Sequence, residues 1–117
     1  MESKAAISAL AALAQETRLA VFRALVRAHS MRADQGGLAA GALAEQLDVP
    51  PATLSFHLKE MANAGLVSSR KDGRSVIYKA NLAAMRTLTD YLLEDCCGGV
   101  CGARQRPETL SQAKECV

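Results

Sequence analysis

Four cysteines are the most chemically distinctive residues of this sequence, and all of them lie towards its C-terminal end. Residues 1–95 contain no cysteine, whereas Cys96, Cys97 and Cys101 are close neighbours and Cys116 follows later. A disulfide framework spreads its cysteines so that they connect distant elements. This cluster instead indicates metal binding or redox chemistry in a reducing compartment.

A second group of chemically useful residues falls on one predicted helix, from Pro51 to about Ala64. Its predicted buried stripe is Leu54, Leu58 and Met61. The opposite face and its flanks carry the candidate DNA-contacting residues Ala52, Thr53, Ser55, Phe56, His57 and Lys59. Small residues allow close approach to the major groove, hydroxyls can reach base edges or phosphates, and Lys59 can neutralise a phosphate.

Two of these residues have an alternative interpretation. An outward Phe56 fits a thymine methyl group, which we favour; in a purely structural protein it would make a core or dimer contact. For His57 we favour a hydrogen-bonded, half-buried position over a role as metal ligand.

A basic β-hairpin is predicted after this helix. Leu66–Lys71 and Arg74–Lys79 have alternating polarity, and Asp72-Gly73 between them is a strong hairpin signal. The wing candidates Arg70, Lys71 and Arg74 crowd its tip, where they could meet the DNA backbone or minor groove.

Five helices are needed to position these groups. Their expected ranges are 3–14, 17–29, 39–47, 51–64, and 81 to about the Gly98-Gly99 pair, with a loop at 31–37. Asn81 is the expected N-cap of the last helix. Outside the 51–64 helix, the expected apolar positions are Ile7, Leu10, Leu13, Leu19, Phe22, Leu25, Val26, Leu38, Leu43, Leu47, Leu82, Met85, Leu88, Leu92 and Leu93.

A short helix, a turn, a second helix and a basic hairpin, in that order, predict a winged helix-turn-helix. The fold class is therefore mainly α with a small β-hairpin. We assign residues 1–95 to one DNA-binding and dimerisation domain and residues 96–117 to a cysteine-bearing segment, which we expect to be largely flexible after Gly102.

The composition excludes several other classes of protein. The chain has 117 residues, 50% of them hydrophobic and 22% charged, with a net charge of +2. No apolar run reaches the roughly 18 residues of a membrane span, and no signal peptide is recognisable, so we expect a cytoplasmic protein with no membrane partner. Neither an oxyanion loop beside Cys96 nor a nucleotide-binding βαβ unit is present, so we expect no enzyme and no organic cofactor.

Several motifs together resemble the ArsR/SmtB family of winged-helix repressors, which sense metals and metalloids. The segments that carry the resemblance are Gln15–Leu25, Leu43–Leu47, Ala52–Met61, Ala64–Val67 and Gly73–Tyr78. The resemblance implies a homodimer formed through the first and last helices. It also implies double-stranded operator DNA with an imperfect inverted repeat, whose half-sites lie roughly 34–36 Å apart.

The cysteine cluster is similar to that of an arsenite-responsive subgroup of this family. Soft thiolates select soft ions, and As(III) or Sb(III) takes three thiolates in a pyramid, which fits Cys96, Cys97 and Cys101. The glycine pair between them would let Cys101 fold back. We therefore predict a repressor of an arsenic-resistance operon that As(III) or Sb(III) releases from its operator.

Other effectors remain open at this point. The effector could be zinc or another thiophilic ion. Zinc requires a fourth ligand, for which Cys116 is available but distant in sequence. Two thiolates suffice for a methylated trivalent arsenical, and a thiol redox sensor is a further alternative. We expect Cys116 to be a bystander.

Overall fold

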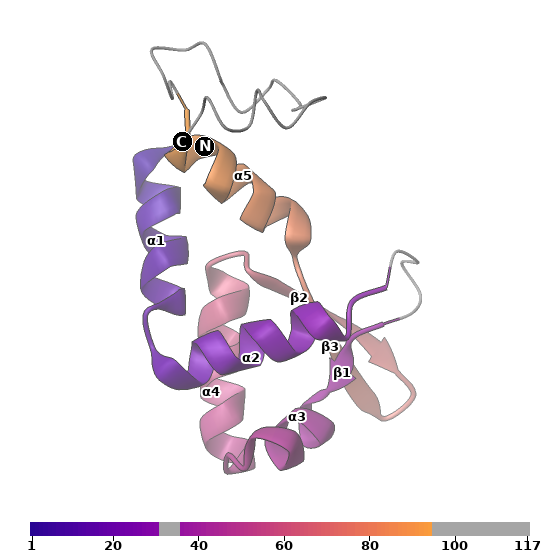
Figure 1. The fold of residues 1–117 in the computed structure, drawn as a ribbon. Helices are drawn as coiled ribbons and strands as arrows, with labels where there is room; N and C mark the ends of the chain where they lie inside the picture. Colours follow the sequence, from indigo (N-terminus) through magenta and orange to yellow (C-terminus); the bar gives the residue numbers. More distant parts are fainter. Residues whose placement is uncertain (31–35, 95–117) are drawn as a thin grey trace.

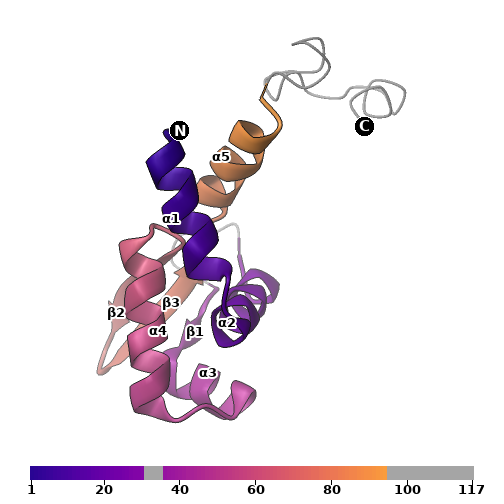
Figure 2. The same cartoon turned by 90° about the vertical axis from the view of Figure 1, so that its left-hand side faces the viewer.

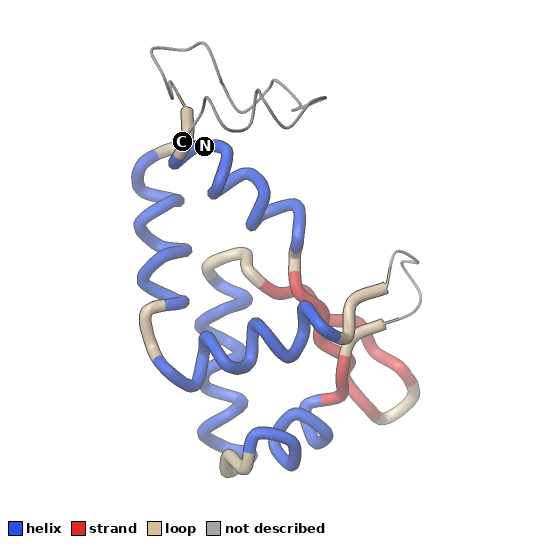
Figure 3. Tube along the Cα trace, in the orientation of Figure 1, coloured by secondary structure: helices blue, strands red, loops and turns tan. Residues whose placement is uncertain are grey.

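The computed structural model describes residues 1–30 and 36–94 of the chain. Its elements are α1 (Ser3–Leu13), α2 (Glu16–Arg27), β1 (Leu38–Ala39), α3 (Ala40–Leu47), α4 (Pro51–Asn63), β2 (Val67–Asp72), β3 (Ser75–Ala80) and α5 (Leu82–Leu92). The described residues thus form five helices and three strands, and Figures 1 and 3 show the small sheet on one side of the helices. The expected winged helix-turn-helix class is confirmed.

The helices divide the molecule into two ends. Helices α1 and α5 lie side by side at one end, where the Ser3 Oγ and Tyr91 hydroxyl oxygens are 2.7 Å apart in a hydrogen bond. Helix α2 crosses the middle, and α3 with the N-terminal half of α4 forms the other end (Figures 1 and 2). The expected N-cap is also confirmed, because Asn81 Oδ1 accepts from the Ala84 N–H at 3.1 Å.

The sheet has one strand more than the sequence predicted. Its order is β1-β3-β2, with both pairs antiparallel, and the additional strand β1 pairs Leu38 with Tyr78 and Ala39 with Ile77. A strand of two residues is too short to show alternating polarity. The sequence therefore does not predict β1, which is defined only by its pairing with β3. A three-stranded sheet therefore replaces the simple hairpin.

The hairpin turn lies one residue later than predicted. Asp72 pairs with Ser75, so Gly73 and Arg74 form the turn instead of Asp72 and Gly73. Gly73 has a φ of 64°, whereas Arg74 keeps a negative φ. A single positive φ at the first turn position is the type II′ arrangement, in which glycine is preferred.

The core lies where α2, α4 and the base of the sheet meet. Its largest fully buried side chains are Val21, Leu25, Leu43, Leu54, Leu58, Met61 and Leu66. Helix α1 packs on this core through its alanines, Ala6, Ala9 and Ala12. The small alanine face lets the helix axis approach closely.

Several apolar positions expected in the core are exposed instead. On α1, Ile7 is 65% and Leu10 43% exposed, because the alanine face is the one that packs inward. On α2, Leu19 and Val26 are exposed, while Val21 and Ala24 take the expected core positions. At the end of α5, Leu92 and Leu93 are exposed as well.

Helix α5 is shorter than predicted. It ends at Leu92, before the glycine pair expected to terminate it. The Leu93 N–H still bonds to Thr89 O at 3.1 Å, but the Glu94 N–H bonds to Tyr91 O at 3.2 Å, three residues back. This tightening of the last turn is a common way for a helix to end.

None of the described helices is by itself long and apolar enough to cross a membrane. Helices α1 and α2 satisfy such a test only when taken together, and they are bent by 97° at the break between them.

Gly37 allows the chain to enter β1 against the backbone of β3. Its φ is 88°, and a Cβ placed on it would lie 2.5 Å from the Tyr78 carbonyl oxygen. We expect Gly37→Ala to lower the free energy of unfolding by about 1–3 kcal/mol, as measured by urea denaturation.

Gly41 is the matched control for this substitution. It lies in α3, and a Cβ placed on it has no neighbour within 4 Å. We expect Gly41→Ala to raise the free energy of unfolding by about 0.5–1 kcal/mol. Equal effects of the two substitutions would contradict a special role for Gly37.

Candidate nucleic-acid interface

A sharp turn between α3 and α4 sets the direction of the second helix. Asp48 adopts a left-handed conformation with a φ of 54°, and the Val49 N–H bonds to Ala44 O at 3.0 Å. Pro51 then occupies the first turn of α4, where a missing N–H costs nothing. The helix ends before Gly65, whose φ of 80° is typical of a helix C-terminus.

The outward face of α4 carries most of the predicted DNA-contacting residues. Leu54, Leu58 and Met61 are buried as expected. Of the predicted DNA-contacting residues on α4, the exposed ones are Ala52, Thr53, Ser55, Phe56 and Lys59. Leu54 and Leu58 pack into the core and fix the orientation of α4, so the exposed side chains have a defined position on its outer face.

His57 does not belong to this exposed set. It is 9% exposed, and its Nδ1 lies 3.4 Å from Nη1 of Arg18 on α2. Arginine can only donate, so Nδ1 is the acceptor of this hydrogen bond. The His57 side chain therefore faces the interior, in agreement with the hydrogen-bonded position favoured from the sequence and unlike the other predicted DNA-contacting residues of α4.

Arg18 connects three helices at this point. Its Nε donates to Ala12 O near the end of α1 at 2.7 Å, and its backbone N–H bonds to the Gln15 side chain at 2.8 Å. With the contact to His57, the α1–α2 joint is tied to the inner face of α4. No local sequence pattern predicts the contact between Arg18 and His57, because the two residues are far apart along the chain.

Phe56 is the largest exposed side chain on α4. It is 57% exposed, and its ring meets His57 edge-on, with ring centroids 5.7 Å apart. It also borders a hollow of about 440 Å³ between α1 and α4, together with Arg18 and Glu60. An exposed aromatic ring in this place can contact an apolar group such as a thymine methyl.

The wing brings basic residues to the same end of the molecule as the start of α4. Lys71 and Arg74 are exposed near the hairpin turn, whereas Arg70 is half-buried. Figures 1 and 2 both place this turn and the N-terminal end of α4 away from the α1–α5 end. Helix α4 and strand β2 also contact each other, so packing sets the position of the wing relative to α4.

The predicted metal ligands Cys96, Cys97 and Cys101 lie outside the described residues, as does Cys116. Within residues 1–30 and 36–94, no three His, Cys, Asp or Glu side chains come together as a metal site. Helix α5 ends at Leu92, and Cys96 comes after it in the sequence.

Comparison with known proteins gives consistent results. A family model described as a helix-turn-helix domain matches residues 13–70. Among solved structures, an ArsR-like transcriptional regulator from Rhodococcus sp. RHA1 is 31% identical, with a TM-score of 0.66 and 76% of each chain covered. No curated protein is significantly similar in sequence.

Two further structures share the fold. A possible transcriptional regulator for arsenical resistance is 30% identical, with a TM-score of 0.58, over 75% of this chain and 86% of its own. A homodimeric winged helix-turn-helix DNA-binding domain from Mycobacterium bovis is 22% identical, with a TM-score of 0.62 and 77% of each chain covered.

Proposed function

Because the chain belongs to the ArsR family of winged helix-turn-helix transcriptional regulators, we propose that it is an arsenic-responsive repressor. It binds double-stranded operator DNA as a homodimer. As(III), or Sb(III), then binds Cys96, Cys97 and Cys101 and releases it. The observation that carries the DNA-binding role is that the exposed N-terminal part of α4 and the basic wing lie at the same end of the molecule.

The exposed face of α4 supports insertion into the major groove. A major groove roughly 12 Å wide admits one helix, and the small Ala52 and Ser55 allow the backbone to approach the bases. Lys59 and the wing residues Lys71 and Arg74 supply the phosphate contacts that fix the register of the helix. These three cations and Ser55 are all exposed.

Exposed apolar residues at the α1–α5 end support a homodimer. Ile7 and Leu10 on α1, Leu92 at the end of α5 and Leu93 directly after that helix are exposed in the single chain. Such residues gain free energy when a second copy covers them. Helices α1 and α5 contact each other, so the two groups can form one interface. A two-fold axis there would direct both α4 helices to an inverted repeat.

The cysteine chemistry supports As(III) as the effector. Three thiolates match the pyramidal coordination of trivalent arsenic, whereas zinc takes four ligands. Cys96 and Cys97 follow Leu92 and Leu93, two residues of the proposed dimer interface, by only a few positions in the sequence. Binding of As(III) to these thiolates would change the orientation of the two protomers relative to each other. A coupling free energy of roughly 1–3 kcal/mol between As(III) and DNA binding lowers DNA affinity by about 5–150-fold.

A titration of DNA binding tests this proposal. Fluorescence anisotropy of the reduced protein on the DNA upstream of its gene is followed while arsenite, and separately zinc, is added. We expect about one equivalent of arsenite per protomer to weaken binding by about 5–150-fold. A Cys96→Ser, Cys97→Ser variant should bind DNA normally and lose this response.

Cys116→Ser is the matched control and should respond to arsenite like the unaltered protein. If arsenite does not change DNA binding, As(III) is not the effector. If zinc releases the protein from DNA and arsenite does not, zinc is the effector. If Cys101→Ser still responds to a monomethylated arsenical, two thiolates form the site. A protein that binds no DNA from this region in either state would refute the repressor role there.

A further inference from the structure

The guanidinium of Arg18 is held in one orientation by the end of α1. Its Nε donates to Ala12 O in the last turn of that helix at 2.7 Å, and the Arg18 backbone N–H bonds to the Gln15 side chain at 2.8 Å. The carbonyl groups at a helix C-terminus also favour a nearby cation. The other end of the guanidinium is therefore directed at α4, where Nη1 lies 3.4 Å from His57 Nδ1.

His57 connects this guanidinium to the exposed face of α4. Its side chain is 9% exposed, whereas the neighbouring Phe56, one of the DNA-contacting candidates, is 57% exposed. The two rings meet edge-on, with their centroids 5.7 Å apart. A change in the position of the His57 ring therefore also changes the packing of Phe56.

The contact between Arg18 and His57 depends on the charge of the imidazole. Only a neutral imidazole has a nitrogen that accepts a hydrogen bond, and both ring nitrogens donate once the ring is protonated. Arginine has no acceptor and keeps its positive charge. Protonation of His57 would place two positively charged donors side by side on a buried residue, so the contact would break.

The other charged groups around α4 are more exposed to water than this pair. Helix α4 packs on α1, α2, α3 and β2. Apart from Arg18 and the half-buried Arg70, the charged residues of these elements and of α4 are all exposed: Lys4, Glu16, Arg23, Arg27, Glu45, Lys59, Glu60, Lys71 and Asp72. Glu60 borders the same hollow as Arg18 and would attract a protonated His57, but water and salt screen an exposed carboxylate. The charged group that bonds to His57 is a cation, which disfavours a second positive charge.

We propose that Arg18 is a positioning residue for DNA recognition that acts through neutral His57, and that protonation of His57 weakens DNA binding. While the contact exists, the joint between α1 and α2 holds the inner face of α4, and Phe56 keeps one position on its outer face. This role of Arg18 rests on the DNA-binding part of the proposed function and does not require the response to arsenic.

The expected pH dependence is opposite to that of simple electrostatic attraction. A histidine that only adds positive charge near DNA strengthens binding as the pH falls, because phosphate attracts cations. If binding requires neutral His57, it weakens instead as the pH falls through the range of roughly 5–8 in which imidazole ordinarily titrates. By linkage, the logarithm of the affinity then falls by up to about one per pH unit for each protomer.

DNA binding measured against pH tests the proposal. Fluorescence anisotropy of the reduced full chain on the DNA upstream of its gene is recorded at constant ionic strength, without arsenic and with a pH-insensitive dye. We expect the affinity to fall by at least about ten-fold between about pH 7.5 and about pH 5.5. Circular dichroism restricts the comparison to pH values at which the protein is folded.

His57→Asn separates the charge of the side chain from its contact. Asparagine Oδ1 takes the place of Nδ1 as an acceptor for Arg18 and does not titrate. We expect this variant to bind DNA like the unaltered protein at the higher pH and to lose no affinity on acidification. His57→Leu has no acceptor, so it should bind about 2–30-fold more weakly at the higher pH and also lose the pH dependence.

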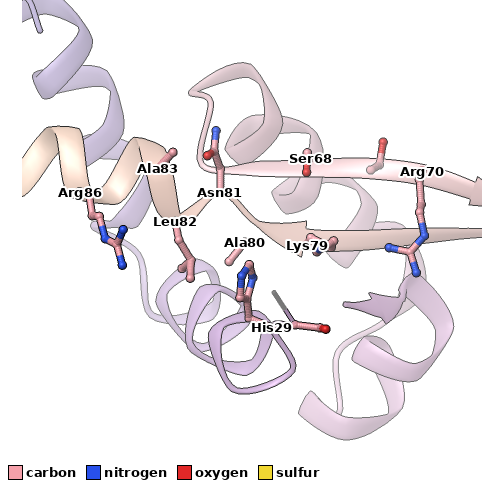
Figure 4. Close-up of a pocket in the computed structure, with 11 residues that line it drawn as sticks. His29, Ser68, Arg70, Lys79, Ala80, Asn81, Leu82, Ala83 and Arg86 are labelled. Carbon is pink, nitrogen blue, oxygen red and sulfur yellow. The ribbon is translucent and has the colours of Figure 1, made fainter. Parts of the chain in front are cut away.

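The second of the two histidines in the chain, His29, provides the matched control. It follows α2 and borders a different hollow, with Ser68 of the wing and Arg86 of α5, as Figure 4 shows. We expect His29→Asn to keep the pH dependence of the unaltered protein.

A proton–nitrogen NMR spectrum of the histidine rings tests the contact without DNA. Because Nδ1 accepts from Arg18, the neutral His57 ring should carry its proton on Nε2. The Arg18 Nε–H signal should change with the same pH midpoint as the His57 ring, since both belong to one contact.

An affinity that rises or stays constant on acidification would overturn the proposal. So would a His57→Asn variant as pH-dependent as the unaltered protein, a His29→Asn variant that loses the pH dependence, or a neutral His57 ring with its proton on Nδ1. These outcomes leave the DNA-binding role intact. A protein that binds no upstream DNA even at the higher pH would refute the repressor role there and the role of Arg18 with it.

Discussion

A Lys71→Glu, Arg74→Glu variant is expected to bind operator DNA at least about 100-fold more weakly than the unaltered protein. Both residues are exposed beside the wing turn, at the same end of the molecule as the start of α4. Each substitution removes a cation that neutralises phosphate and adds a charge that phosphate repels. In the proposed dimer every change occurs twice.

The salt dependence of binding identifies the cause of this loss. We expect the slope of log affinity against log salt concentration to become shallower by at least about two. The control is Arg23→Glu, Arg27→Glu, which makes the same charge change on exposed residues of α2. It should alter affinity far less. Similar losses in both variants would mean that net charge, and not the wing, determines DNA binding.

A Leu58→Ala variant is expected to lose about 2–5 kcal/mol of unfolding free energy. Leu58 is 1% exposed and lies on the inner face of α4, within the core cluster. Its truncation leaves a cavity beneath the helix that the proposed function places in the major groove. For a domain stabilised by about 5–15 kcal/mol, this is a large part of the total.

Urea denaturation followed by circular dichroism measures this loss. Leu19→Ala is the matched control, since the same atoms are removed from a side chain that is 47% exposed. We expect it to cost less than about 1 kcal/mol. A Leu58→Ala protein as stable as the Leu19→Ala protein would contradict the packing described for α4.

The parts of the fold that the sequence predicted are those with local signals. Pro51 and Gly65 delimit α4, the change from helical to alternating polarity marks the wing, and Asn81 caps α5. Each of these signals acts within a few residues of the position it determines. The exposed DNA-contacting candidates on α4 follow from the same local periodicity.

The features that the sequence did not predict depend on contacts between distant segments. The choice of the alanine face of α1 over the face with Ile7 was not predictable, because both faces are apolar at helical spacing. The contact between Arg18 and His57 and the strand β1 exist only once the chain has folded.

The strand order β1-β3-β2 also has a consequence for the behaviour of the free protein in concentrated solution. In the described part of the chain β2 pairs only with β3, so the backbone groups on its other edge are not paired with a strand and could pair with a strand of another molecule. Exposed edges of this kind promote edge-to-edge aggregation, which charged residues suppress. Lys71 and Arg74 stand near the end of this edge, and two copies brought together there would repel each other. The residues proposed to attract DNA thus also keep DNA-free molecules apart.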